Sequence, residues 1–219
     1  MTFRHMMFQT MVERSLKLMT TIGASSLLAA VAMAQSPRFT VTDLGNVGAD
    51  GQPFQVTNTG LVGGTAMVGS ALHGVLWYGG HLLDIGTPGL KGQNSQVYGV
   101  NVWGQTVGEA ETATPSGGED FCGFAALGLP SAGGTCVPFL WQNGVMNPLP
   151  TLGGENGTAN KINTLGMVAG TAENKMPDAT CPSDGPQKYQ FKPIVWRNGS
   201  VQELPTYAGD PAGTAMDDQ

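Results

Sequence analysis

One segment recurs three times along the chain and constrains its fold more than any other feature. The copies are HGVLWYGGHLLDIGTPG at 73–89, VPFLWQNGVMNPLPTLG at 137–153 and KPIVWRNGSVQELPTYA at 192–208. Each copy is an apolar run that ends in Trp, followed by a tight turn, a second apolar run and a corner rich in Gly, Pro and Thr. Short apolar runs bounded by such turns are typical of β-strands, so the pattern predicts a repeat-built all-β protein.

Two more strand-like runs precede each copy, so one period holds four expected strands. The repeats cover about 45–85, 86–149 and 150–204, and a partial repeat occupies 205–219. Four strands in a period of about 41 residues are typical of a β-propeller blade. The sequence therefore predicts an all-β fold of propeller-like blades, each with four short antiparallel strands. About three full repeats plus partial ones give an incomplete propeller. The expected strands are 54–57, 61–66, 74–77, 81–85, 96–100, 105–110, 138–141, 145–149, 159–162, 167–172, 193–196 and 200–204.

The differences in length between the repeats fall in one place. Four corner residues mark the ends of the repeats and are 41, 64 and 55 residues apart: Leu44, Ile85, Leu149 and Leu204. The extra residues of the second and third repeats lie between the second and third strands, at 111–136 and 173–191. Because loops on a rigid scaffold concentrate recognition, we expect any ligand on the face that carries these two insertions.

The turn residues fit this strand order. Asn143-Gly144 and Asn198-Gly199 stand between apolar runs, and Asn-Gly is the preferred pair for two-residue hairpin turns with positive φ. A second turn joins the first two strands of each repeat, where an Asn or Thr is followed three residues later by a permissive glycine. The pairs in this second turn are Thr57 and Gly60, Asn101 and Gly104, and Asn163 and Gly166.

The recurring Trp residues have two interpretations. Trp77, Trp141 and Trp196 each end an apolar run, which favours packing between neighbouring sheets. Burial of one such ring contributes on the order of 2–3 kcal/mol. The alternative is that these rings stack on sugars, but none of them lies in an insertion.

These motifs resemble the HAF repeat family, a family of extracellular repeats named for a His-Ala-Phe-like tripeptide before a Trp. Residues 73–77 are similar to that tripeptide and its Trp, and the corners at 43–48 and 149–154 are similar to the family's Asp-Leu-Gly corner. Residues 159–170 follow its Ala-x-x-Ile-Asn-x-x-Gly-x-Val-x-Gly strand pair. The His is missing from the second and third copies. The resemblance covers 39–219 and implies export, a propeller-like β architecture and no catalytic residues.

The first residues have the features of a secretory signal peptide. Basic residues precede an apolar run and a small-x-small motif of the kind that signal peptidase cleaves. These features are Arg4, Arg14, Lys17, residues 18–31 and Ala32-Met33-Ala34. We expect cleavage after Ala34, so that 1–34 is the signal peptide and 35–219 is a secreted or periplasmic repeat domain. The run is too short and too polar for a stable membrane span, and an uncleaved anchor is the alternative.

The amino-acid composition supports an exported all-β protein and limits the classes of partner that it can bind. The chain has 33 Gly and 14 Pro, is 41% hydrophobic and is only 12% charged. These values fit short strands joined by turns and not a disordered acidic chain. Without residues 1–34, 7 basic and 15 acidic residues remain, a net charge near −8. No basic stripe remains, so nucleic acid is not an expected partner. Extracellular carbohydrate or protein, bound by the insertions, is the expected partner class.

The three cysteines lie in the insertions. Cys122 and Cys136 are the favoured disulfide pair, because an exported chain meets oxidising conditions and this loop is short. The position of Cys181 leaves the other two pairings open. A metal site is not expected, because the sequence has no Cys-x-x-Cys motif and the mature chain has only His73 and His81.

Four acidic residues, Glu109, Glu111, Glu119 and Asp120, cluster near the start of the larger insertion. Two converging carboxylates can act as the acid and base of a glycosidase or bind Ca²⁺. The favoured interpretation is a solvated acidic loop. No nucleophile elbow, phosphate-binding loop or dinucleotide-binding motif occurs, so no cofactor is expected.

The sequence predicts an exported, non-catalytic β-repeat scaffold that acts as a binding or structural module of the cell exterior or envelope. The first alternative is a propeller hydrolase that cleaves extracellular polysaccharide, using Glu109 or Glu119 with Asp120. The second alternative is a remnant of a longer repeat protein, because the partial repeat stops within a strand pair and leaves an open sheet edge.

Overall fold

A computed structural model describes residues 40–44, 51–131, 133–182, 185 and 187–205. The chain divides into two units, Met1–Asp43 and Leu44–Gln219, and the features below lie in the second. The expected signal peptide, its cleavage site after Ala34 and residues 206–219 of the partial repeat lie outside the described residues. The part of the chain that is described has no helix long and apolar enough to cross a membrane.

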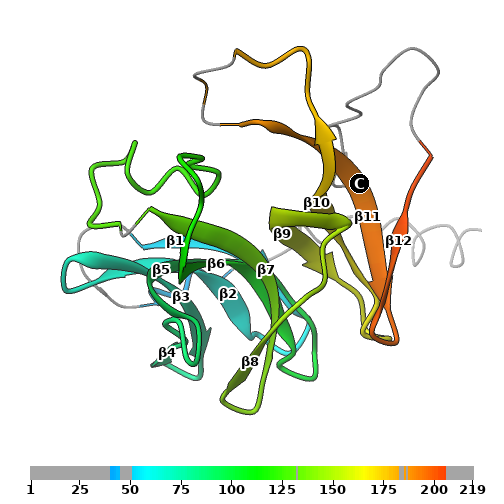
Figure 1. The fold of residues 1–219 in the computed structure, drawn as a ribbon. Helices are drawn as coiled ribbons and strands as arrows, with labels where there is room; N and C mark the ends of the chain where they lie inside the picture. The colour runs from blue at the N-terminus through cyan, green and yellow to red at the C-terminus, as the bar shows by residue number, and fades with distance from the viewer. Residues whose placement is uncertain (1–39, 45–50, 132, 183–184, 186, 206–219) are drawn as a thin grey trace, which may run out of the picture. The chain divides into compact units, whose positions relative to one another are not determined.

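The described residues form three four-stranded sheets, each an antiparallel meander of consecutive strands (Figure 1). The strands of the first sheet are β1 (Gln52–Val56), β2 (Val62–Val68), β3 (Ala71–Tyr78) and β4 (His81–Asp84). Those of the second are β5 (Lys91–Val100), β6 (Thr106–Pro115), β7 (Gly134–Gln142) and β8 (Val145–Pro148). Those of the third are β9 (Gly153–Ile162), β10 (Val168–Pro177), β11 (Tyr189–Arg197) and β12 (Ser200–Glu203). The prediction of an all-β fold with four antiparallel strands per repeat is confirmed.

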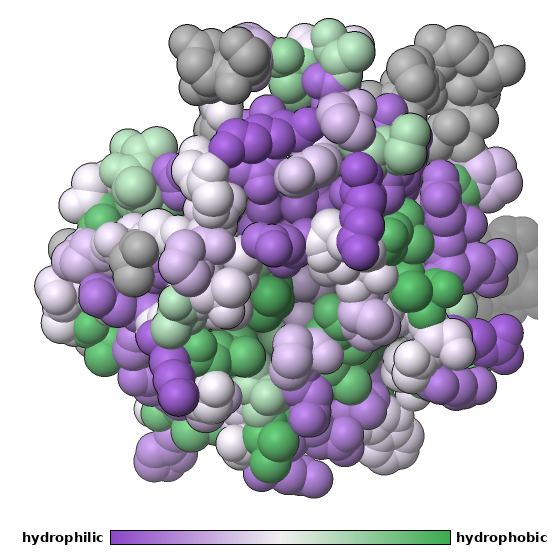
Figure 2. Space-filling view, viewed as in Figure 1, coloured by the Kyte–Doolittle hydropathy of each residue, from purple (hydrophilic) through white to green (hydrophobic). Residues whose placement is uncertain are grey.

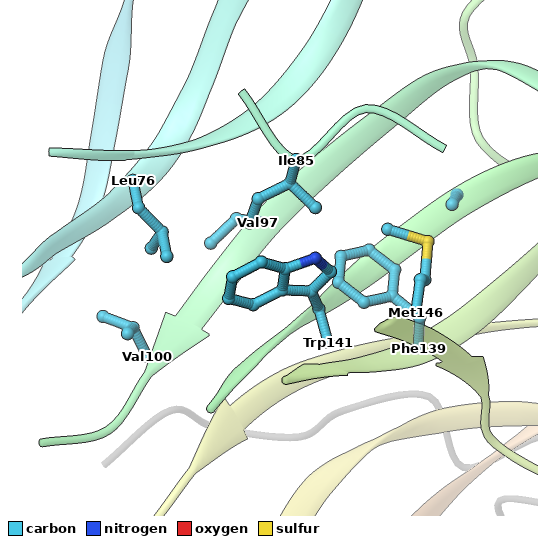
Figure 3. Packing of buried hydrophobic residues seen from close by; sticks show 8 residues of the cluster. Leu76, Ile85, Val97, Val100, Phe139, Trp141 and Met146 are labelled. Atoms are coloured by element: carbon cyan, nitrogen blue, oxygen red, sulfur yellow. The ribbon is translucent and has the colours of Figure 1, made fainter. Parts of the chain in front are cut away.

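Consecutive sheets pack through the first strand of the later sheet. Strand β5 contacts β1, β2 and β3, and strand β9 contacts β5, β6 and β7. Between the first and second sheets, the ring of Trp141 lies in a cluster with Leu76, Val97 and Phe139 (Figure 3). The equivalent rings of Trp77 and Trp196 are 4% and 2% exposed and belong to two further clusters. The clusters of Trp141 and Trp196 therefore lie between consecutive sheets, whereas the cluster of Trp77 is built from residues of the first sheet.

Each sheet has the same irregularity in its first strand. One extra residue interrupts the pairing with the second strand, at Phe54, Tyr98 and Asn160 respectively. Opposite the second bulge, a Cβ added to Gly108 would lie 1.8 Å from the carbonyl oxygen of Gln96, so this position admits no side chain. A bulge redirects the side chain of its extra residue. In the second sheet the extra residue is Tyr98, whose hydroxyl group contacts Glu109 on β6.

The insertions expected at 111–136 and 173–191 are shorter loops than the sequence suggests. Their flanks continue the neighbouring strands, which end or begin at Pro115, Gly134, Pro177 and Tyr189. The physical reason is pairing: Glu111 lies opposite Cys136 and Glu173 opposite Phe191, so the backbone keeps its ladder partners. The remaining loops, 116–133 and 178–188, are called the second-repeat loop and the third-repeat loop below.

The hairpin turns lie at the other end of the strands from these loops (Figure 1). Asn143 and Asn198 adopt φ values of 52° and 51°, and the glycine after each also has positive φ. This geometry is that of the two-residue turns that match the twist of antiparallel strands.

The turn between the first two strands is held by a side chain in every sheet. The side-chain carbonyl of Asn101 accepts the N–H groups of Trp103 and Gln105, at 3.0 and 3.1 Å. Asn163 does the same in the third sheet, and the Thr57 hydroxyl takes this place in the first. The amide group of Asn101 also donates to the carbonyl of Asn163 at 3.0 Å, so the turns of adjacent sheets are bonded to each other.

Candidate functional site

The second-repeat and third-repeat loops meet at one end of the second and third sheets. The backbone N–H of Lys188 donates to Glu119 Oε1 at 2.7 Å, and the Lys188 ammonium donates to the carbonyl of Gly117. The rings of Phe121 and Phe191 stack with their centroids 4.3 Å apart. Figure 2 shows hydrophilic side chains gathered on the upper middle of this face, where Figure 1 places β9 and β10 between the two loops. The two insertions, far apart in sequence, thus form one continuous surface.

A polar cleft of about 590 Å³ opens in this surface. Its walls come from the second-repeat loop, the start of β9, the end of β10 and the residues before β11. The cleft is lined by two lysines, two glutamates, a tyrosine and a serine: Lys175, Lys188, Glu119, Glu155, Tyr189 and Ser116. Its volume lies within the range of small-molecule sites, and its lining offers donors, acceptors, charge and one aromatic ring.

The acidic residues of the larger insertion do not form a solvated loop, and that expectation is wrong. Glu109, Glu111 and Glu119 are buried, with exposed fractions of 5%, 1% and 5%. Asp120 is half-buried, and its carboxylate accepts the N–H of Ala126 within the loop. A buried carboxylate is tolerated when it is hydrogen-bonded, and each of these side chains has partners of its own.

Glu111 belongs to a network that joins the first and second sheets. Its carboxylate accepts hydrogen bonds from the Asn94 amide at 3.1 Å, from the Gln93 N–H at 3.3 Å and from the Ser131 hydroxyl. The side-chain carbonyl of Asn94 accepts the N–H of Leu72, in the third strand of the preceding sheet, at 3.0 Å. Asn94 therefore links β3 to the acidic residue on β6.

Glu173 occupies the equivalent place in the third repeat. It accepts hydrogen bonds from the N–H of Asn156 and from its side-chain amide, at 3.0 and 3.1 Å. The side-chain carbonyl of Asn156 accepts the N–H of Cys136, in the third strand of the second sheet, at 2.9 Å. The Asn156 amide also donates to Glu119 at 3.3 Å, so one amide bridges two carboxylates. Burial raises the pKa of Glu173, and the nearby Glu119 carboxylate raises it further.

The sequence analysis did not identify this network, although a signal for it was present. Asn94 and Asn156 are separated by 62 residues, and so are Glu111 and Glu173. Each Asn follows a Gly-x pair, and each Glu follows an Ala at the end of the second expected strand. The same alignment places Met67 at the Glu position of the first repeat, so the pattern is not complete in every copy.

Glu109 has a different environment, on the same face of β6. Its carboxylate accepts the hydroxyl proton of Tyr98, the bulge residue of β5, at 3.0 Å. Gln96 donates to the same oxygen at 3.5 Å. Burial raises the pKa of Glu109 to about 7, and the hydrogen bond from Tyr98 opposes part of that rise. Glu109 therefore changes its protonation state near neutral pH.

A disulfide joins Cys122 and Cys136, with their Cα atoms 5.6 Å apart, and Cys181 is free. The bond ties the second-repeat loop to β7. The two sulfurs and a carboxylate oxygen of Glu109 lie within 4.8 Å of one another. With both sulfurs in the disulfide, this group offers a cation one carboxylate and no thiolate.

The structure does not bring Glu119 and Asp120 together as a pair around the cleft. Glu119 is bonded to Asn156 and to the N–H of Lys188, and the carboxylate that shares its donor is Glu173. Glu173 is completely buried, so a substrate has no access to it. Of the acidic residues named from the sequence, Glu119 lines the cleft and Glu109 faces the disulfide.

A second hollow of about 430 Å³ lies at the hairpin end of the first and second sheets. Its lining includes Tyr78, Trp103 and Trp141, of which Trp103 is 71% exposed. The Trp103 indole donates to the carbonyl of Thr164 at 3.0 Å, so its ring is held in place while it faces solvent. Among the described residues, Trp103 is exposed, whereas the recurring Trp of each repeat is buried.

Comparisons with protein-family models, curated proteins and solved structures found no match to this chain. The resemblance to HAF repeats therefore rests on the motifs, and the functional argument rests on the geometry of the two loops and the cleft between them.

Proposed function

We propose that this chain is an exported, non-catalytic scaffold of HAF-type repeats, whose sheets are blades of a propeller, and that it binds carbohydrate in the cleft between its two insertion loops. The observation that carries the proposal is the cleft itself. The extra residues of two repeats converge there, bonded through Lys188 to Glu119 and Gly117, on a scaffold of paired strands. Recognition concentrates on loops that a rigid framework positions.

The lining of the cleft favours a hydroxyl-rich ligand. Lys175, Glu155 and Tyr189 are exposed at its surface and are available to a ligand. A sugar presents hydroxyl groups, which both donate and accept hydrogen bonds, and an apolar ring face that stacks on an aromatic side chain. The exposed ammonium group of Lys175 can pair with a carboxylate, so sugars that carry one are the first class to test.

Calorimetric titration with uronic-acid-containing and neutral oligosaccharides tests the proposal. We expect binding of the acidic sugars, weakened at least about tenfold, or about 1.4 kcal/mol, in the double variant Lys175→Ala/Tyr189→Ala. The matched control is Trp103→Ala, which removes an exposed ring at the hairpin end and should leave the affinity unchanged. Loss of binding in Trp103→Ala alone would move the site to the hollow at the hairpin end and contradict the proposal.

The two alternatives give different results in the same experiments. A polysaccharide hydrolase would release products from these oligosaccharides, and Glu119→Gln would abolish the release. Binding without turnover supports the non-catalytic module. Binding of short peptides in place of sugars would mean that the cleft is the binding site but that its ligand is a peptide. A non-functional remnant would bind neither class, with or without the substitutions.

A further inference from the structure

The Cys122–Cys136 disulfide joins a half-buried residue to a buried one. Cys122, in the second-repeat loop, is half-buried, whereas Cys136, on β7, is 1% exposed. The Glu109 carboxyl lies within 4.8 Å of both sulfurs and is buried on β6, the strand that pairs with β7. An incoming thiolate therefore meets Cys122 first, and cleavage of the bond leaves its electron pair on Cys136, beside Glu109.

Cys136 needs a proton when the bond breaks. Cys136 is buried beside a carboxyl group, and a buried thiolate is unfavourable because burial disfavours the charged form of the group. The titratable groups that surround the Glu109 carboxyl are Tyr98 from β5 and the two cysteines from β7 and the second-repeat loop. On β9, Lys161 donates to the backbone carbonyl of Tyr98. The pKa of Glu109 is about 7, because burial disfavours its charged form, so this carboxyl holds a proton in a large share of molecules at neutral pH.

We propose that Cys122–Cys136 is a reactive disulfide that exchanges with external thiols, and that Glu109 donates a proton to the departing sulfur of Cys136. The thiolate of a small-molecule or protein thiol attacks Cys122 Sγ and forms a mixed disulfide with it. The Cys122–Cys136 bond breaks, Cys136 Sγ receives the electron pair and takes the Glu109 proton, and Glu109 is left as a carboxylate. A second thiol resolves the mixed disulfide, so that two external thiols are oxidised and one protein disulfide is reduced.

Contacts of the second-repeat loop favour re-formation of the disulfide after reduction. Phe121, next to Cys122, stacks on Phe191 of β11, and Phe124 is 1% exposed. These contacts do not depend on the disulfide, so they keep Cys122 close to Cys136 in the reduced protein. The reverse reaction then needs only an oxidised partner, with Glu109 taking the proton back. This activity is independent of ligand binding in the cleft.

The rate of reduction by dithiothreitol, divided by the thiolate fraction of the reagent at each pH, tests the role of Glu109. In the unmodified protein we expect this corrected rate constant to be high at pH 6 and to fall as the pH rises through about 7, because Glu109 loses its proton. In Glu109→Gln it should be lower at pH 6, on the order of tenfold, and independent of pH. Identical profiles in the two proteins would overturn the proposal.

Two further variants separate this role from a purely structural one. Tyr98→Phe removes the hydrogen bond that lowers the pKa of Glu109, so the fall in rate should move to higher pH. Glu203→Gln makes the same charge change at an exposed position of β12 and should leave the profile unaltered. Peptide mapping after brief exposure to glutathione should find the adduct on Cys122, and an adduct on Cys136 would contradict the order of attack.

Discussion

Asn94 and Asn156 lie at the same position of consecutive repeats and make the same pair of contacts. Each side-chain carbonyl accepts an N–H from the third strand of the preceding sheet, at 3.0 and 2.9 Å. Each side-chain amide donates to a buried glutamate of its own sheet, at 3.1 Å in both cases. These two residues join neighbouring sheets by polar contacts where the apolar clusters join them by packing.

Replacement of Asn156 tests how much this contact stabilises the protein. Asn156→Ala leaves the Cys136 N–H without its acceptor and removes a donor from both Glu119 and Glu173. Buried polar groups that lose a partner cost about 1–3 kcal/mol each, so we expect a loss of about 3 kcal/mol in the free energy of unfolding. Urea unfolding measures it. The matched control, Asn147→Ala at an exposed position of β8, should stay within about 0.5 kcal/mol of the unmodified protein. Equal losses in the two variants would contradict the prediction.

Glu109 should make the free energy of unfolding depend on pH, and the direction of this dependence follows from its raised pKa. Its pKa is raised from 4.5 to about 7 on folding, so between these values only the folded state holds the proton. The free energy of unfolding should therefore fall as the pH rises through this window, by about 3 kcal/mol in total. Glu109→Gln removes the dependence, and its stability relative to the unmodified protein should rise by that amount from pH 4 to pH 8.

Urea unfolding of both proteins at these two pH values measures the difference. Because Glu173 titrates in the same direction in both proteins, its contribution cancels. Parallel pH curves for the two proteins would show that Glu109 ionises normally in the folded state.

The disulfide should stabilise the fold by limiting the unfolded chain. Cys122 and Cys136 are 14 residues apart in sequence. Closing a loop of this size contributes about 3 kcal/mol. Urea unfolding with and without reductant, in a Cys181→Ser background that avoids exchange with the free thiol, should show that loss. An unchanged midpoint after complete reduction would contradict the prediction, because it would show that the disulfide does not limit the unfolded chain.

The Trp of each repeat should act on stability and not on ligand binding. The Trp196 indole donates to the carbonyl of Pro150 at 2.7 Å, and its ring is buried in the cluster of the third sheet. Trp196→Phe should lower the free energy of unfolding by about 2 kcal/mol through the lost hydrogen bond and volume. Thermal unfolding and sugar titration of this variant check both parts. A loss of affinity without a loss of stability would favour the sugar-stacking interpretation.

Much of the fold was predictable from the sequence because its signals are local. The Asn143-Gly144 turn, the glycine three residues after Asn101 and the apolar run before Trp141 each act over a few residues. Because these signals occur in three copies, the order of the strands could be predicted. The lengths of the strands could not be predicted from them. Glu111 and Glu173 look like loop residues in sequence, and they are strand residues because β7 and β11 offer them backbone partners.

The sequence by itself determined the repeat, the four strands of each sheet, the turns between them and the favoured cysteine pair. Only the tertiary structure decided where the acidic residues lie and what they touch. Glu119 meets Asn156, 37 residues away, and the N–H of Lys188, 69 residues away, because two sheets pack side by side and carry their loops with them. No local sequence pattern predicts how these two sheets pack. The charge of a carboxylate predicts exposure, and here the donors supplied by a neighbouring sheet make its burial stable.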